Sequence, residues 1–292
     1  MRRFLLAAIA LGVTSGAQAA DMPDIAPVLR GSFTPTSSWS GWYAGGTAAY
    51  NSSAHDFSGS LSGLTNFIYR DTVLEEPTSG LSALGKATTQ GTGFGAFVGR
   101  NWQWDDVVLG VEANYNYLSR LSTSTSSSLG PLLIVNPAGE TPAPGDTDSY
   151  SVTVSGSAKA TLQDMLTFRA RAGWAFDDFL PYAFGGLAVA RVDVQRSVTT
   201  YTSKNIEHIQ TNPDGSTTVT NTGYIKLPQV SLTQSQGRSN NFVAGWTAGL
   251  GFEYRLWGGL FARAEWEYVG LMPIQNVSIN INSARAGLGY KF

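Results

Sequence analysis

The chain has 292 residues, of which only 14% are charged, whereas an ordinary soluble domain has about 25%. It has no cysteine, so disulfides, thiolate metal sites and cysteine nucleophiles are excluded. The 19 basic and 21 acidic residues nearly balance, which argues against nucleic acid as a partner because such a partner requires a basic face. The 42% hydrophobic content leaves two classes open: a soluble protein, or a membrane β-barrel that averages an apolar outside with a polar inside.

The first nineteen residues have the pattern of a secretory signal peptide. A basic start is followed by an apolar run over 4–13 and by an Ala-Gln-Ala cleavage site that ends at Ala19. A short buried N-terminal helix is the alternative for this segment. We therefore predict a signal peptide at 1–19, a proline-containing extended periplasmic tail at 20–38 and one domain at 39–292. An acidic exported protein without cysteine suits a Gram-negative envelope.

After residue 19 no apolar stretch approaches the roughly 18 to 20 residues that a membrane-spanning helix needs. The longest candidate, 179–190, contains Pro181 and two glycines. If the chain spans a membrane, it must do so as a closed β-barrel, because this is the only backbone arrangement other than the helix that satisfies every N–H and C=O group in lipid.

Residues in several segments alternate between two faces, which indicates β-strands with one apolar side. In 260–268 the even positions are Leu, Ala, Ala, Trp and Tyr, whereas Arg263, Glu265 and Glu267 occupy the opposite face. Segments 109–117, 166–174, 244–254 and 284–292 follow the same pattern. The full set of predicted strands is 41–50, 91–101, 107–118, 158–174, 180–194, 241–254, 259–269 and 277–292.

The connections between these strands are of two kinds. Those at 102–106, 175–179 and 255–258 are short, while 51–90, 119–157 and 195–240 are long. The sequence therefore predicts an all-β fold, an eight-stranded antiparallel up-and-down transmembrane β-barrel with three long extracellular loops and both termini in the periplasm. Seven of the eight residues in 121–128 are serine or threonine, which predicts mobile loops without a packed core. Segments 150–154 and 216–220 contain enough β-forming residues to extend the hairpins above the membrane.

Aromatic residues support the barrel because they collect at two heights, as in the interfacial girdles of membrane barrels. The alternative, a soluble sandwich core, would not need two bands. The predicted inner girdle is Trp102, Trp104, Trp174, Phe176, Phe179, Tyr182, Phe252, Tyr254, Trp257, Tyr290 and Phe292, and the predicted outer girdle is Tyr50, Tyr115, Tyr117, Trp266 and Tyr268.

Four motifs carry a resemblance to a known family: WSGWYAGG at 39–46, the hairpin from GRNWQ at 99–103 to VLGVE at 108–112, RARAGWAF at 169–176 followed by LPY at 180–182, and ARAGLGYKF at 284–292. They resemble the small outer-membrane β-barrel proteins of alphaproteobacteria, often described as immunogenic outer-membrane proteins or porin-family proteins. The barrel-assembly machinery reads a C-terminal aromatic residue in that family, so the resemblance implies that Tyr290 and Phe292 act in insertion. Packing of Phe292 at the membrane interface is the simpler alternative.

Charged residues gather on the inward face of the predicted barrel. An arginine facing lipid at the midplane costs about 2–4 kcal/mol, whereas arginine and carboxylate groups buried together satisfy many donors. We therefore predict a polar plug that holds the barrel closed, and the alternative is a charge-lined pore. The inward charged residues are Glu112, Arg169, Arg171, Glu253, Arg263, Glu265, Glu267 and Arg285, with Arg191 near the outer end.

Catalysis is not expected. His55 and His208 are the only histidines and fall in predicted external loops, so a rim Ser/His arrangement is missing. Glu265 and Glu267 could serve as paired carboxylates of a glycosidase, but neighbouring arginines would keep both ionised. Some members of the resembling family are described as haemin-binding, which leaves haem or ligand binding by the loops as an alternative, although two isolated histidines are weak evidence for it.

These observations predict an outer-membrane protein with a structural and surface-interaction role, that is, envelope integrity with antigenic or adhesive loops. The alternative is a narrow porin-like channel for small solutes. Expected partners are outer-membrane lipids, the barrel-assembly machinery during insertion, and host or environmental ligands at the loops. We expect no cofactor, no metal and no nucleic acid.

Overall fold

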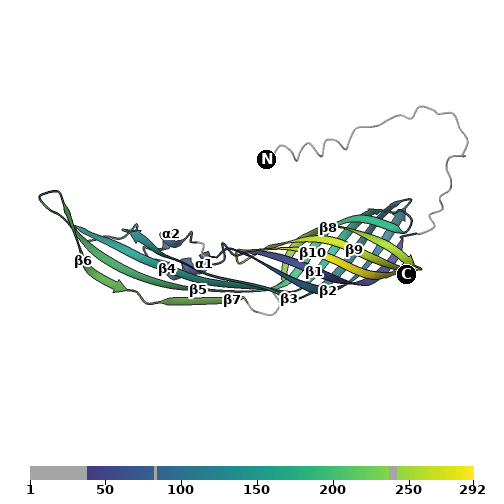
Figure 1. Cartoon of the computed structure of the whole chain (residues 1–292), viewed down its shortest axis with the longest axis horizontal. Coiled ribbons are helices and arrows are strands. Elements are labelled where there is room, and N and C mark those ends of the chain that lie inside the picture. The colour runs from purple at the N-terminus through teal and green to yellow at the C-terminus, as the bar shows by residue number, and fades with distance from the viewer. Residues whose placement is uncertain (1–37, 82–83, 237–241) are drawn as a thin grey trace, which may run out of the picture. The chain divides into compact units, whose positions relative to one another are not determined.

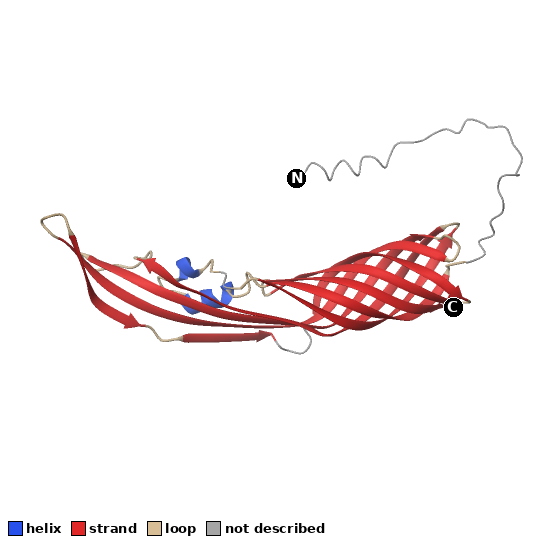
Figure 2. Ribbon diagram, in the orientation of Figure 1, coloured by secondary structure: helices blue, strands red, loops and turns tan. Residues whose placement is uncertain are grey.

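A computed structural model describes residues 38–81, 84–236 and 242–292. The predicted signal peptide and all but the last residue of the predicted tail lie outside these ranges. Figure 1 labels the elements and colours them in chain order, and Figure 2 distinguishes helices from strands. No helix among the described residues is long and apolar enough to cross a membrane. The elements are β1 (Gly41–Asp56), α1 (Ser62–Tyr69), α2 (Glu75–Thr78), β2 (Lys86–Trp104), β3 (Val107–Val135), β4 (Asp146–Trp174), β5 (Phe179–Thr211), β6 (Thr217–Lys226), β7 (Val230–Gln236), β8 (Phe242–Trp257), β9 (Leu260–Ile274) and β10 (Val277–Lys291).

Eight strands close into a ring by antiparallel pairing. The order around the ring is β1, β2, β3, β4, β5, β8, β9 and β10, and the pairing of β10 with β1 completes it. These are the eight predicted strands, so the predicted eight-stranded barrel is confirmed. The two further strands, β6 and β7, both pair with β5.

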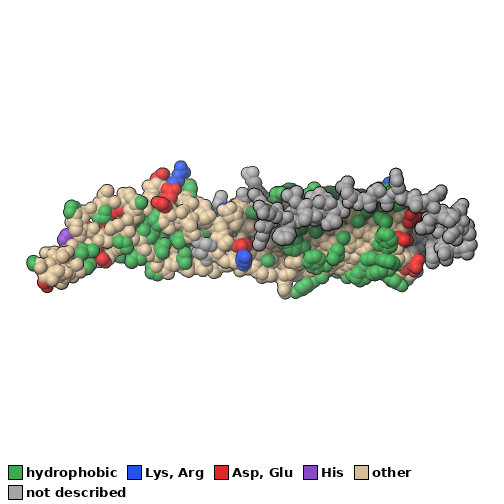
Figure 3. Space-filling model, turned by 90° about the horizontal axis from the view of Figure 1, so that it is seen from above, with side chains coloured by type: hydrophobic (Ala, Val, Ile, Leu, Met, Phe, Trp, Pro, Cys, Tyr) green, Lys and Arg blue, Asp and Glu red, His purple; other side chains and the backbone are tan. Residues whose placement is uncertain are grey.

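Alternating residues explain why these segments become barrel strands. In β9, Arg263, Glu265 and Glu267 are buried, whereas Trp266 between them is 50% exposed. Neighbouring barrel strands show the same alternation. Figure 3 shows hydrophobic side chains gathered along the outer surface of the barrel strands. A strand whose two faces differ in this way has only one register that keeps its charged residues away from lipid.

The aromatic residues predicted for the two girdles are on the outward face, with one exception. Trp102, Trp174 and Tyr290 near the short turns are exposed, as are Tyr50 and Tyr115 toward the opposite end. Tyr182 was predicted for the inner girdle, and this is wrong because it is only 5% exposed. Strand β5 begins at Phe179, whose side chain faces outward. Because side chains alternate between the two faces of a strand, Tyr182 faces the lumen.

The predicted long loops at 119–157 and 195–240 are largely strands instead. Pairing between β3 and β4 continues to Val135 opposite Ser149, and pairing between β4 and β5 continues to Asp146 opposite His208. Serine and threonine do not oppose this pairing, because their hydroxyls bond across the strands, as between Ser128 and Ser155 at 2.9 Å. The prediction of mobile hydroxyl-rich loops is therefore wrong for these segments, whereas the predicted extension of the hairpins is correct.

The predicted loop at 51–90 contains a packed apolar core, which the composition did not predict. Phe57 and Leu61, together with Leu64 of α1, are buried in the same cluster as Val152 and Val154 of β4. Leu61 packs so closely on Gly156 of β4 that a side chain there would meet the Leu61 methyl group. The extension of β3, β4 and β5 beyond the ring therefore has a packed core, covered on one face by this segment.

Candidate functional site

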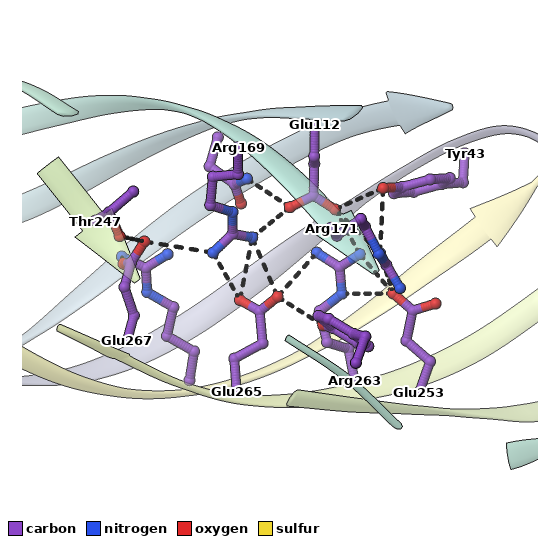
Figure 4. Close-up of polar contacts among 12 residues, drawn as sticks. Tyr43, Glu112, Arg169, Arg171, Thr247, Glu253, Arg263, Glu265 and Glu267 are labelled. Atoms are coloured by element: carbon purple, nitrogen blue, oxygen red, sulfur yellow. Dashed lines mark hydrogen bonds and ion pairs between the residues drawn. The ribbon is translucent and has the colours of Figure 1, made fainter. Parts of the chain in front are cut away.

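The candidate site is the barrel lumen, where the structure places all eight predicted charged residues. Each occupies an inward position of its strand, and each is at most 5% exposed. Their strands surround the lumen, so their side chains approach one another from several sides (Figure 4). Glu112 comes from β3, Arg169 and Arg171 from β4, Glu253 from β8, Arg263, Glu265 and Glu267 from β9, and Arg285 from β10.

Glu112 is shared by three arginines. Its carboxylate forms an ion pair with Arg169, lies 2.6 Å from Arg263 Nη2 and lies 3.4 Å from Arg171 Nη1. The hydroxyl of Tyr43 also donates to Glu112 Oε2 at 2.9 Å. One carboxylate thus connects strands β3, β4, β9 and β1, as Figure 4 shows.

The other three carboxylates extend the network in both directions along the lumen. Glu253 lies 2.8 Å from Arg171 and 2.6 Å from Arg263. Glu265 lies 3.1 Å from Arg169. Glu267 lies 3.4 Å from Arg169 and forms an ion pair with Arg285. By contrast, Arg191 is not part of this network, because it pairs with Asp164 near the outer end of the barrel strands.

Neutral side chains complete the network, and the sequence analysis did not assign them to it. The hydroxyl of Tyr182 donates to Glu265 at 2.6 Å, and that of Thr247 donates to Glu267 at 2.8 Å. The Asn114 amide donates to Glu112 at 2.6 Å. Each of these residues is at an inward position of a predicted strand. The alternation that identified the charged residues could therefore have identified them too.

Aromatic rings lie against three of the guanidinium groups. Arg169 lies 4.0 Å from the ring centre of Phe184, Arg171 lies 3.8 Å from that of Tyr182, and Arg263 lies 3.8 Å from that of Phe97. Such cation–π contacts stabilise arginine where water is excluded. They also fill space beside the planar groups, so the network is packed as well as paired.

The charges of this network balance, with four carboxylates and four guanidinium groups. Moving a single charged group out of water costs several kcal/mol, and mutual pairing offsets this cost only when the geometry and the extra hydrogen bonds are good. The shared contacts of Glu112 and the tyrosine hydroxyls satisfy this condition at the centre of the network. Among the described residues, Arg285 has only its ion pair with Glu267. The arrangement holds strands together and offers neither a free nucleophile nor an unpaired carboxylate for catalysis among the described residues.

Apolar layers lie on both sides of the network. Toward the short turns, Trp39, Tyr43, Phe97, Leu180 and Phe261 form part of one buried cluster. Toward the extension, a second buried cluster continues from the barrel strands into the extension and includes Leu118, Leu162, Met165, Val269 and Ile281. The lumen is therefore filled by an ion-pair network between two apolar clusters.

The two histidines lie in strands and not in the loops where they were predicted. His55 in β1 is 1% exposed, lies 2.9 Å from the Ser53 hydroxyl and stacks on the Phe57 ring at 5.8 Å. His208 in β5 lies 2.6 Å from Asp146. In the part of the chain that the structure describes, no group of three or more His, Cys, Asp or Glu residues could hold a metal ion.

The C-terminal aromatic residues Tyr290 and Phe292 are outside the lumen and exposed. Their rings make an edge-to-face contact at 5.4 Å. The backbone N–H of Phe292 donates to the carbonyl of Trp42 at 2.9 Å, which ties the C-terminus to the start of β1.

The chain matches the model of the outer-membrane protein β-barrel domain family over residues 5–292. It belongs to this family. The protein is therefore an outer-membrane protein that crosses the membrane with β-strands. No curated protein matches the chain in sequence.

The solved structures to which this chain is similar include the following three. Neisserial surface protein A has 10% sequence identity and a TM-score of 0.31, over 87% of this chain and 98% of that chain. The attachment invasion locus protein Ail of Yersinia pestis has 9% identity and a TM-score of 0.31, over 87% and 99%. The N-terminal β-barrel domain of Pseudomonas aeruginosa OprF has 12% identity and a TM-score of 0.29, over 84% and 97%.

Proposed function

We propose that this protein is a closed, non-enzymatic barrel that contributes to the integrity of the outer membrane and presents an extended sheet for surface interactions. The observation that carries this proposal is the buried network of Glu112 and its partners, enclosed between two apolar clusters. Side chains just fill the interior of an eight-stranded barrel. The motifs in the strands favour the alphaproteobacterial branch of the family.

The extension of β3, β4 and β5 is the proposed interaction surface. The N-terminus of β1 and the C-terminus of β10 both lie at the short-turn end, which is the periplasmic side in bacterial barrels. The extension then faces outward from the cell. Its exposed face carries serines and threonines together with Tyr201 of β5, which is 45% exposed. Tyr224 of β6, which pairs with β5, is 66% exposed. Hydroxyl and tyrosine groups suit hydrogen bonding and stacking with host or environmental ligands.

The rival function is a narrow channel, and conductance in a planar bilayer distinguishes it. The protein is first shown to be folded by heat-modifiable gel migration and is then added to the bilayer. We expect no discrete current steps from the wild type, and none from Arg263→Gln or Glu265→Gln, which lose stability instead. Reproducible steps from the folded wild type, altered in size by either substitution, would contradict a closed barrel and make these residues selectivity determinants.

The environments of the two histidines bear on the alternative function of haem binding. His55 is enclosed by Ser53 and Phe57, and His208 is paired with Asp146, so neither geometry favours haem binding. Haemin titration followed by absorbance tests this directly. We expect the same haemin spectrum from the wild type and from a His55→Gln/His208→Gln variant. A Soret shift that the wild type shows and the variant does not would contradict this expectation.

We further propose that Tyr290 and Phe292 are read by the barrel-assembly machinery. Support comes from their position on the alternating last strand and from their exposure. Phe292→Ala is expected to lower the amount of assembled protein in cells, while its folding into lipid vesicles without the machinery stays close to that of the wild type. Equal losses in both settings would favour a role in interfacial packing alone.

A further inference from the structure

Arg100 is the charged residue on the outward face of β2 between Trp104 and Phe94. It lies opposite Trp42 of β1 and Val111 of β3, and Val111 in turn lies opposite Ala170 of β4. Its guanidinium is 5.6 Å from the Trp42 ring and 5.2 Å from the Trp102 ring, and it contacts no carboxylate among the described residues. A cation on the lipid side without a counter-ion requires an explanation, because such positions are costly.

The height of Arg100 along the barrel indicates what it faces. Trp42 and Trp102 belong to the aromatic girdle beside the short turns, and both are exposed. Such girdles lie at the level of the lipid headgroups. A guanidinium held between these two rings therefore lies near the phosphates, while its aliphatic stem remains in the apolar layer.

A groove of about 410 Å³ runs from Arg100 across the neighbouring strands. Trp42, Val98 and Phe168 supply bulky parts of its wall, while the small side chains of Ala113 and Ala170 leave the depression between them. Glu112 and Arg169 also border it, but their charged groups are engaged in the lumen. The groove is therefore apolar along its length and has a cation at one end.

We propose that Arg100 and this groove bind one glycerophospholipid, with its phosphate on the guanidinium and one acyl chain along the groove. The arginine fork matches two phosphate oxygens and pairs with them more strongly than with neutral acceptors. The apolar wall matches an acyl chain, and no carboxylate of the described residues forms an ion pair with this guanidinium. The proposed periplasmic orientation of the short turns places this lipid in the inner leaflet, but the binding chemistry does not depend on that orientation.

Native mass spectrometry of the folded full chain in detergent tests the site. Dimyristoylphosphatidylglycerol is titrated in, and dimyristoylglycerol serves as the same diacylglycerol without the phosphate-containing headgroup. We expect one tightly bound phospholipid, about tenfold weaker binding for Arg100→Gln, and weaker binding for Ala170→Leu, which fills the groove. Lys86→Gln removes a positive charge elsewhere on β2, and this variant is expected to bind the phospholipid as tightly as the wild type does. Dimyristoylglycerol is expected to bind Arg100→Gln and the wild type with the same affinity.

Three results would overturn the proposal. The first is equal phospholipid binding by the wild type and a folded Arg100→Gln protein. The second is binding of dimyristoylglycerol as tight as that of the phospholipid, since the phosphate would then contribute nothing. The third is tighter binding of lipid A than of phosphatidylglycerol, which would assign the site to the lipopolysaccharide of the other leaflet. Arg100→Lys keeps the charge but not the fork, and intermediate binding by this variant supports recognition of phosphate.

Discussion

Arg169 of β4 lies directly opposite Glu112 of β3 in the register of the two strands, and their side chains form an ion pair inside the lumen. Arg171 and Arg263 approach the same carboxylate. Three positive groups therefore share this one acid, which makes Glu112 the centre of the network and the first residue to change.

Glu112→Gln is expected to lower the free energy of unfolding by about 3–5 kcal/mol, because it leaves buried guanidinium groups without their shared counter-ion. Denaturant unfolding of the protein in lipid vesicles, followed by tryptophan fluorescence, measures this loss. Glu76→Gln makes the same chemical change at an exposed position of α2 and should change stability by less than about 0.5 kcal/mol. Equal effects of the two substitutions would show that the network contributes little to stability.

Gly156→Ala tests the packing of the 51–90 segment on the extension. The new methyl group would meet Leu61, which is 2% exposed and has little free space. Overpacking of this kind costs about 1–3 kcal/mol, so we expect faster amide exchange in α1 and around Leu61.

Gly63→Ala is the matched control for Gly156→Ala. It adds the same methyl group within α1, where no heavy atom other than those of the adjoining residues and the helix backbone lies within 4 Å. Alanine favours a helix over glycine by up to about 1 kcal/mol, so amide exchange in α1 should slow. Faster exchange in both variants would contradict the assigned packing.

His55 lies five residues beyond Tyr50 of the outer girdle and so outside the membrane-crossing part of β1. Burial lowers the pKa of His55 from its ordinary value of 6.5 to about 4. Between pH 6.5 and pH 4 the unfolded chain binds a proton that the folded protein does not. The free energy of unfolding contributed by this residue therefore falls as the pH is lowered through that range, by up to about 3 kcal/mol.

Urea unfolding of the wild type and His55→Gln at pH 7.5 and pH 4.5 measures this contribution. The glutamine variant does not titrate, so its stability should fall less than that of the wild type between the two pH values. The same pH dependence in both proteins would show that His55 takes up its proton equally easily when folded and unfolded.

Lys204 in the extension lies 2.5 Å from Glu140 and 2.8 Å from Asp148. Hydrogen bonds with these two carboxylates raise the pKa of Lys204, so it stays charged throughout the physiological range. Lys204→Met leaves two neighbouring acids without a cation, and we expect faster amide exchange around Asp148. Lys226→Met, at an exposed position of β6, should leave that exchange unchanged. If Lys204→Met has no effect, the ion pairs do not hold this end of the sheet together.

The barrel strands could be predicted from sequence because lipid and lumen demand opposite residues on the two faces. The two-residue period of a strand places Arg263 and Glu265 on one face and Trp266 on the other, independently of residues distant in sequence. Tyr182 was assigned to the girdle because it is aromatic. Its position in the alternation places it in the lumen, so aromatic character alone does not determine which face a residue occupies. The hydroxyl-rich 121–128 segment was predicted to be a mobile loop, because composition does not reveal whether a partner strand is available.

The sequence by itself determined the number of barrel strands, their polarity pattern and the residues that face inward, because these depend on neighbours along the chain. Only the tertiary structure decided which charges meet. Glu112 and Arg263 are 151 positions apart, and their contact exists because the closed ring and its register bring β3 and β9 to the same lumen. The same holds for Leu61 and Gly156, whose packing depends on a loop folding back onto strands that the sequence pattern does not connect to it.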